Sequence, residues 1–395
     1  MSFVCGHSRP TPRRPEPGAF LCLLSLGAVA CGGVPTGTGP GGTEVAAVSV
    51  TPNPAAVAVG ESIQLVATVL DANGDTLTGH PVTWTSANAA LAGVSNSGAV
   101  SGVAEGTGSI TATSGGKSGS ATLTVTAPLP AGFPRFGHVF IVMEENSNYA
   151  SVIGNAQMPY LNGLATEYGL ATQYFANTHP SIGNYFMLTT GQVLTNSDSY
   201  SGTVTADNIV RRLIAAGKTW KVYAENLPPG GNLTISTTGS YLSRHNPVVY
   251  FSDVRNDPRQ AANVVPFTRL ATDLANGTLP NWAMIVPNAC DDAHDCSLST
   301  ADSWLLEHIA PLIANPVFQQ DGLLLILFDE SGGDNTNGGG RVAWVAVSGK
   351  AKGGYRSVTL YQHQSTLRLM LMGLGITSFP GASAGAAEMT EFFNP

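Results

Sequence analysis

The sequence is poor in charged residues. Only 11% of its 395 residues are Asp, Glu, Lys or Arg, and the formal net charge is −8. It contains no run of basic residues and no stripe in which basic and aromatic side chains alternate. A protein that binds the phosphates of a nucleic acid needs such a positive surface. The composition therefore argues against a nucleic-acid partner.

A long hydrophobic run is missing at the N-terminus. The apolar segment at residues 19–30 is too short to span a bilayer as a mature helix. Arg13 and Arg14 precede it, so residues 1–31 are predicted to be an export signal. Small residues directly before Cys31 resemble a bacterial lipoprotein signal, although the usual leucine three residues before the cysteine is Ala28. We expect Cys31 to carry a lipid anchor that holds the protein at a membrane, and simple secretion is the alternative.

Cysteine is scarce, with five residues in the chain. Beyond the signal and Cys31, the only cysteines are Cys290 and Cys296. Two cysteines so close together in an exported chain favour a disulfide within one loop, which would brace His294 and Asp295. A metal-binding role for these thiols is disfavoured because many oxygen ligands lie nearby in the sequence.

The segment after the signal has two parts. Residues 32–45 are rich in Gly, Pro and Thr and predict a flexible linker. Residues 46–126 contain short alternating strands separated by turn residues, which predicts a small all-β sandwich. The predicted strands are residues 48–50, 63–69, 82–85, 98–100, 108–112 and 121–125. This segment resembles the bacterial immunoglobulin-like modules of group 2, and we interpret it as a spacer or adhesive module without chemistry because it lacks clustered His, Cys or paired acids.

The pattern changes after a proline-rich linker at residues 127–134, so a second domain is predicted at 135–395. It contains continuous apolar runs at residues 138–143, 219–224, 282–286 and 323–328, and a helical pattern at 207–216 with Asp207 as a plausible N-cap. Buried strands that alternate with helices predict an α/β domain with a mostly parallel sheet. Each of the four runs is followed by acidic or amide side chains. Such a sheet would bring them together at the carboxyl ends of its strands.

Ser181 follows a proline and precedes an apolar helical pattern. Pro180 fixes its own φ and biases His179 away from the helical region, so the chain should turn sharply there. Ser181 would then lie at a helix N-terminus, where backbone N–H groups favour an anion. The sequence therefore predicts a nucleophile in a phosphate site. The alternative is an ordinary N-cap serine.

The acids after two of the strands predict a metal site. Glu145, Asn146, Asp329 and Glu330 offer carboxylate and amide oxygens, which suit Mg, Ca, Mn or a harder Zn site. Four histidines lie in the same domain, each beside loop-forming residues: His179, His245, His294 and His363. A divalent metal ion, a hydroxyl and several histidines together suit phosphoryl transfer. Taken singly, each histidine is as well explained as a structural or exposed residue.

Residues 136–391 resemble the phosphoesterase family that groups bacterial acid phosphatases and phospholipases C, a branch of the alkaline-phosphatase-like superfamily. The motifs that carry the resemblance are residues 142–146 with Tyr149, 179–185, 220–225, 245–251, 287–288, 294–295, 302–305, 328–330 and 363–367. The resemblance implies an alkaline-phosphatase-like sheet with flanking helices.

The resemblance also implies roles for individual residues. The metal ligands would be Glu145, Asn146, Ser181, Asp329 and Glu330, and Ser181 would form a phosphoserine intermediate. His294 and His363 would be catalytic, one histidine serving as the general acid. The substrate-binding residues would be Asn184, His179, His245 and Asp295.

Three hypotheses for the function remain. The first is a metal-dependent phosphomonoesterase of the acid phosphatase type, exported and surface-anchored, with a phosphate ester as substrate. The second is a phospholipase C acting on phospholipid phosphodiesters at the same site. This is less favoured because Ser331 follows Glu330 where many family members have a histidine, and because the catalytic domain is short. The third is an inactive surface binding or adhesion protein.

Overall fold

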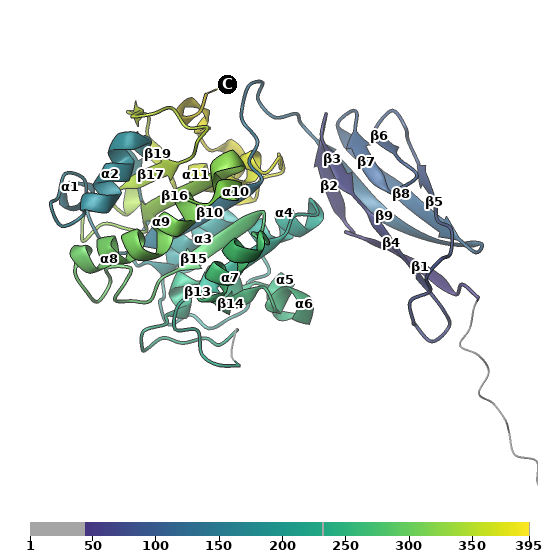
Figure 1. The fold of residues 1–395 in the computed structure, drawn as a ribbon, viewed down its shortest axis with the longest axis horizontal. Helices are drawn as coiled ribbons and strands as arrows, with labels where there is room; N and C mark the ends of the chain where they lie inside the picture. Colours follow the sequence, from purple (N-terminus) through teal and green to yellow (C-terminus); the bar gives the residue numbers. More distant parts are fainter. Residues whose placement is uncertain (1–43, 231–232, 395) are drawn as a thin grey trace, which may run out of the picture. The chain divides into compact units, whose positions relative to one another are not determined.

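The computed structural model describes residues 44–230 and 233–394. The predicted signal, Cys31 and most of the predicted linker at 32–45 lie outside these residues. Figure 1 shows an N-terminal part built of strands alone and a C-terminal part in which helices flank a sheet. Each part has its own hydrophobic cluster, one within residues 45–125 and the other within 136–393. Among the described residues, no helix is both long and apolar enough to cross a membrane.

Strands with alternating burial form the N-terminal part. In β9, Ala121, Leu123 and Val125 are buried and the threonines between them are exposed. The strand orders are β1-β4, β2-β9-β8-β5 and β3-β7-β6. The bounds are β1 Ala47–Thr51, β2 Ala55–Ala58, β3 Ser62–Gln64, β4 Val66–Leu70, β5 Thr83–Ser86, β6 Ala92–Val94, β7 Ala99–Gly102, β8 Gly106–Ser114 and β9 Lys117–Thr126. The predicted all-β fold is confirmed, and β2 and β6 are additional strands.

The predicted strand at residues 63–69 is two strands. β3 pairs with β7, whereas β4 pairs with β1. Leu65 lies between them, is buried, and donates its N–H to the Gly98 carbonyl. The chain changes partner at this residue. An alternating apolar pattern cannot indicate such a change, because the alternation continues through it.

The four apolar runs form the centre of an eight-stranded sheet in the C-terminal part. They are β10 (His138–Glu144), β13 (Trp220–Ala224), β15 (Trp282–Val286) and β16 (Gly322–Phe328). The sheet order is β14-β13-β15-β10-β16-β17-β11-β18, and these four strands are adjacent and parallel. Outside them lie β11 (Gly169–Ala171), β14 (Val264–Pro266), β17 (Trp344–Val347) and β18 (Arg356–Ser357), while β12 (Tyr174–Phe175) pairs separately with β19 (Tyr361–Gln362). Only β17 runs antiparallel to its neighbours in the described sheet. The predicted α/β fold with a mostly parallel sheet is confirmed.

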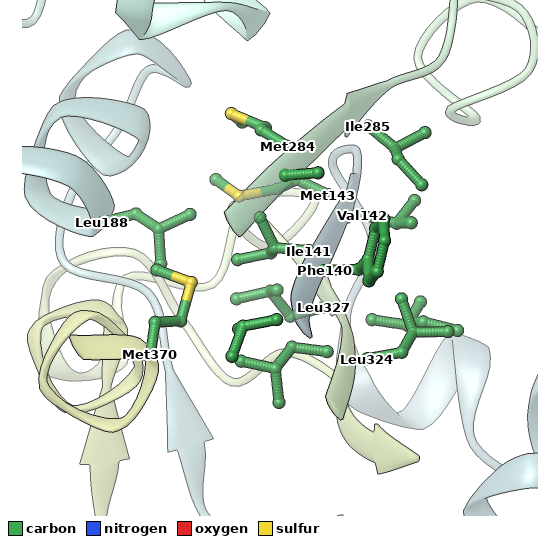
Figure 2. Packing of buried hydrophobic residues seen from close by; sticks show 14 of the residues in the cluster. Phe140, Ile141, Val142, Met143, Leu188, Met284, Ile285, Leu324, Leu327 and Met370 are labelled. Atoms are coloured by element: carbon green, nitrogen blue, oxygen red, sulfur yellow. The ribbon is translucent and has the colours of Figure 1, made fainter. Parts of the chain in front are cut away.

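Helices cover both faces of this sheet. Figure 2 shows Ile141 of β10 facing Leu188 and Met370, while Phe140 points to the other side of the strand. Leu188 and Met370 belong to α3 (Ile182–Thr190) and α11 (His363–Gly373), and the ring of Phe140 lies 6.2 Å from that of Phe318 in α10 (Pro316–Asp321). The other helices are α1 Tyr149–Val152, α2 Pro159–Glu167, α4 Ile209–Ala215, α5 Ser252–Arg255, α6 Pro258–Ala261, α7 Arg269–Asn276, α8 Leu298–Trp304 and α9 Ala310–Ile313. Since successive side chains of a strand alternate between faces, Glu145 is directed to the same side as Ile141 and α3.

The predicted helix at residues 207–216 is α4, and its N-cap is Asn208. The Asn208 side chain accepts a hydrogen bond from the Arg211 N–H. The carboxylate of Asp207 instead forms an ion pair with Arg212. Both Asp and Asn are favourable N-caps, so the sequence alone does not choose between neighbours of these types.

Candidate active site

The parallel sheet brings the acidic segments together as expected. Glu145, Asp292 and Asp329 follow the carboxyl ends of β10, β15 and β16, which are neighbours in the sheet. The backbone also ties the three segments to one another. The Glu145 N–H donates to the Asp292 carbonyl, and the Asp329 N–H donates to the Glu144 carbonyl. These side chains therefore share one edge of the sheet.

Ser181 joins this edge from the start of α3. Its backbone is helical (φ −43°, ψ −51°), and its side chain makes no capping hydrogen bond. The buried hydroxyl donates instead to Glu145 Oε2 at 3.1 Å. Ser181 is therefore not an ordinary N-cap serine, because its oxygen is directed at a carboxylate 36 residues away in the sequence rather than at its own helix.

Glu145 and Asp329 form a crowded pair of buried carboxylates. Glu145 Oε1 accepts a hydrogen bond from Tyr185 Oη at 2.5 Å, and Asp329 Oδ1 accepts one from the Asn146 N–H at 3.0 Å. Burial, followed by the charge of Asp329, raises the pKa of Glu145 well above its usual value. Burial likewise raises the pKa of Asp329. Asp329 Oδ2 is buried and has no hydrogen-bond partner among the described residues.

His245 completes the group and is held by Asp292. Its Nδ1 donates to Asp292 Oδ2 at 2.9 Å, which leaves a lone pair on Nε2. That Nε2 lies 3.3 Å from Glu145 Oε1 and has no hydrogen-bond partner among the described residues. Burial, and then the charge of Arg244, lower the pKa of His245 to about 3, so the ring is neutral. The ring also stacks on Tyr185, with 3° between the planes.

These atoms fit a divalent metal ion. Glu145, His245 and Asp292 place donor atoms within 4.8 Å of one another. Asp292 already accepts hydrogen bonds from His245 and from the His294 N–H. It is therefore better suited to orient His245 as a metal ligand than to bind the metal itself. The unpartnered Nε2 of His245 and Oδ2 of Asp329 offer lone pairs beside Glu145 and Ser181. A cation there would also relieve the repulsion between the carboxylates. Oxygen and imidazole ligands together suit Mn, Fe or Zn as well as the harder ions.

Asn146 and Glu330 flank this group in different ways. Asn146 has φ 51°, an uncommon conformation for a residue other than glycine, and its Nδ2 lies 3.4 Å from Glu145 Oε2. Glu330 Oε2 pairs with His179 Nδ1 at 3.1 Å and accepts a bond from Asn184 Nδ2 at 3.3 Å. Burial, and then the charge of Asp329, raise the pKa of Glu330 to about 8.

His179 and Asn184 therefore contact the expected metal ligand Glu330. Asn184 also accepts the N–H groups of Asn177 and Thr178 through Oδ1, so it orients the turn before Ser181. Both ring nitrogens of His179 face oxygen acceptors, since its Nε2 lies 3.0 Å from the Asp334 carbonyl. Burial lowers the pKa of His179, but the Asp334 carbonyl and the charge of Glu330 raise it more, and the net pKa is above its usual value.

His363 does not face the site as expected for a catalytic residue. It is fully buried, and its Nε2 donates to the Asp329 backbone carbonyl at 2.7 Å. Its Nδ1 lies 3.1 Å from Tyr174 Oη. Burial lowers the pKa of His363 to about 4, so the ring is neutral. With both nitrogens engaged by protein groups, His363 positions the Asp329 backbone and has no free proton for a leaving group.

His294 also differs from its expected role. Its Nε2 lies 3.1 Å from Arg244 Nη2, and because an arginine only donates, Nε2 must be the acceptor. Its Nδ1 then donates to Asp295 Oδ1 at 2.7 Å. The Asp295 side chain is 62% exposed. In this state His294 has no Nε2 proton to donate, and it holds a guanidinium instead.

The loop that carries these residues is closed by the Cys290–Cys296 disulfide. Asp292, His294 and Asp295 all lie inside it. Residues that the sequence analysis did not assign also line the site, namely Tyr185, Asp292 and Arg244. Their positions depend on contacts between segments tens of residues apart, and a sequence pattern carries no signal of those contacts. Tyr185 additionally resembles an ordinary core residue of its helix.

Comparison with known proteins identifies both parts of the chain. The model of the phosphoesterase family matches residues 155–372, more than half of the chain, and that of the bacterial Ig-like domain (group 2) matches 44–125. A phosphatidylinositol-3-phosphatase of Mycobacterium tuberculosis is 36% identical over 206 residues, which are 52% of this chain and 67% of that protein. A probable acid phosphatase of Kluyveromyces lactis is 34% identical over 210 residues, which are 51% of this chain and 48% of that protein. The match therefore spans about half to two thirds of these relatives.

A solved structure is similar over a longer stretch at lower identity. It is a crystal structure of a protein in the alkaline phosphatase superfamily from Vibrio parahaemolyticus. The similarity has 12% identity and a TM-score of 0.44, and it covers 68% of this chain and 71% of that chain.

Proposed function

Because the chain belongs to the phosphoesterase family, we propose that it is a metal-dependent phosphomonoesterase of the acid phosphatase type, in which Ser181 is the nucleophile. The observation that carries the proposal is the position of the Ser181 hydroxyl. It donates to Glu145 at the point where Glu145, Asp329 and His245 meet, at the N-terminus of a buried helix. An ordinary structural serine does not need three ionisable groups around it, nor two nearby atoms whose lone pairs have no hydrogen-bond partner.

The residues divide the work of ester hydrolysis. Ser181 Oγ attacks phosphorus while its proton passes to Glu145, the bond from phosphorus to the ester oxygen breaks, and the leaving alcohol takes up a proton from water. Water then hydrolyses the phosphoserine, which releases phosphate and regenerates the hydroxyl. Glu145 orients the Oγ–H before attack, and Asp292 keeps the lone pair of His245 directed inward. Glu145, Asp329, His245 and Ser181, with Asn146 and Glu330 nearby, would hold a divalent metal ion, whose positive charge would favour the serine alkoxide.

The substrate we propose is a phosphate monoester. The relatives named above are called a probable acid phosphatase and a phosphatidylinositol-3-phosphatase, and both names describe a phosphatase. We further propose that the protein is exported, with the Ig-like domain as a spacer and Cys31 as the lipid attachment point at a membrane.

Hydrolysis by the purified protein tests the proposal. An aryl phosphate monoester and an aryl phosphocholine diester are incubated with the enzyme, with and without chelator. We expect turnover mainly of the monoester, loss of that turnover with chelator, and recovery when a divalent metal is added. Turnover mainly of the diester would favour a phospholipase C, and turnover of neither substrate with any metal would favour a binding protein.

A further inference from the structure

Arg244 is a cation in the site that the catalytic scheme does not use. It lies in the short 3-10 helix η1 (Ser243–His245), next to His245. Its side chain is only 11% exposed. Nη2 donates to His294 Nε2 at 3.1 Å, while the buried Nε has no hydrogen-bond partner within the described residues. A guanidinium has five N–H donors in a planar fork, so this one keeps capacity for a further anionic partner.

The carboxylate nearest to Arg244 holds it weakly. Asp198 Oδ2 lies 3.7 Å from Arg244 Nε, beyond hydrogen-bonding distance. The other oxygen of Asp198 accepts the Ile182 N–H at 3.3 Å, a long contact at the start of α3. Asp198 thus lies between a guanidinium and the helix N-terminus beside Ser181, two groups that both favour an anion. It occupies a position suited to negative charge without making short contacts to either group.

We propose that Arg244 binds two terminal oxygens of the substrate phosphate and thereby selects monoesters over diesters, with Asp198 as its counter-ion when no substrate is present. The inference rests on the proposed function and adds the specificity of the same site. A chain of contacts connects Arg244 to the nucleophile. The rings of His294 and His245 lie 5.6 Å apart, His245 reaches Glu145, and Glu145 accepts the Ser181 hydroxyl.

Charge explains why such a residue would discriminate. When Ser181 attacks, a monoester presents three non-ester oxygens that share two negative charges, whereas a diester presents two oxygens that share one. A planar guanidinium that pairs with two oxygens of one phosphate binds a dianion more strongly than a monoanion. In a diester, the second ester group would replace one of these oxygens and leave a buried arginine less well paired.

The experiment compares substrates in the full-length protein. Arg244→Gln removes the charge, Arg244→Lys keeps a charge without the fork, and Asp198→Asn neutralises the counter-ion. Arg259→Gln is the matched control, since Arg259 is 84% exposed in α6 and pairs only with Asp257 among its described contacts. For each protein, kcat/KM is measured for an aryl phosphate monoester and a bis-aryl phosphate diester, and the dissociation constant of inorganic phosphate is measured by calorimetry.

Loss of a charge-assisted contact should lower monoester kcat/KM by about 10- to 100-fold in Arg244→Gln. The diester value should stay within a few-fold, so the ratio of the two falls. The dissociation constant of phosphate should rise in Arg244→Gln, and that of Arg244→Lys should lie between those of the wild type and Arg244→Gln. Asp198→Asn should bind phosphate at least as tightly as the wild type, and Arg259→Gln should match the wild type.

Three results would overturn the inference. Equal losses for monoester and diester would mean that Arg244 only supports the fold of the loop, and unchanged constants would mean that it does not contact phosphate. Weaker phosphate binding in Asp198→Asn would mean that Asp198 is not displaced by the ligand. If the wild type hydrolyses neither ester, the proposed function fails. The dissociation constants of phosphate for the wild type and for Arg244→Gln then still show whether Arg244 binds phosphate.

Discussion

Hydrogen-bond partners distinguish four histidines that look alike in the sequence. His363 donates to a backbone carbonyl, His294 accepts from Arg244, and His245 has one free lone pair beside Glu145. His179 faces Glu330 Oε2 at Nδ1 and the Asp334 carbonyl at Nε2. Their neighbours in the sequence do not indicate these states, because the partners other than Asp295 come from different segments. The sequence could therefore predict which residue types gather at the site but not what each ring does there.

Asp292 provides a test of metal binding at the scale of one residue. Asp292→Asn places an amide opposite His245 Nδ1, which favours the tautomer whose proton is on Nε2 and removes the lone pair beside Glu145. Loss of such an orienting carboxylate is expected to weaken metal binding about 10- to 100-fold. Metal titration of activity should show this shift, with turnover partly restored at high metal concentration.

Asp295→Asn is the control for that variant. Asp295 is in the same disulfide-closed loop, but its side chain is largely exposed and contacts His294. It should titrate with metal as the wild type does. If the metal concentration needed for activity shifts equally in both variants, the substitutions disturb the loop as a whole, and Asp292 does not specifically orient His245.

At the scale of elements, the long apolar strands were predictable and the short ones were not. β10, β13, β15 and β16 are continuous buried runs, and their acidic ends were expected at one edge of a sheet. β18 and β19 have two residues each and show no periodicity that could be recognised. The fold around the site was thus predictable because it depends on the long strands.

A buried carboxylate anchors one helix to the sheet and makes stability depend on pH. Asp273 of α7 accepts hydrogen bonds from Tyr223 Oη at 2.7 Å and Thr278 Oγ1 at 3.0 Å, and it pairs with Lys221 of β13. Burial alone would raise the pKa of Asp273, but the bonds from Lys221 and Tyr223 lower it below its usual value. Because the folded pKa is lower than the unfolded one, the stabilisation is present above about pH 4 and is lost as the pH falls through the folded pKa.

Asp273→Asn should therefore reduce the free energy of unfolding at neutral pH by about 2 kcal/mol, the contribution of hydrogen bonds to a charged group. The difference from the wild type should shrink as the pH falls below 4. Urea unfolding at several pH values measures it. Glu307→Gln is the control, because Glu307 is exposed and lies in the same C-terminal part of the chain. It should leave the free energy of unfolding unchanged. A difference that stays constant with pH would contradict the account.

At the scale of the whole molecule, the sequence predicts two kinds of hydrophobic core. Apolar residues alternate with period two up to residue 125 and form continuous runs after 138, and the described residues contain two hydrophobic clusters, one in each of these regions. The convergence of Ser181 with Glu145 was the least predictable feature from residues alone, since it depends on how α3 packs against the sheet. The residue types alone suggested a hydroxyl, acids and histidines acting together, and the resemblance to a family assigned Ser181 and Glu145 to one metal site.

The most direct test of the central claim is to look for phosphate on Ser181. The full-length protein is mixed with an aryl phosphate, quenched in acid during turnover, and digested for peptide mass spectrometry. We expect a phosphate adduct on Ser181 in the wild type, and neither adduct nor turnover in Ser181→Ala with the fold retained. Turnover by Ser181→Ala at an ordinary rate, or an adduct on another residue, would contradict the account.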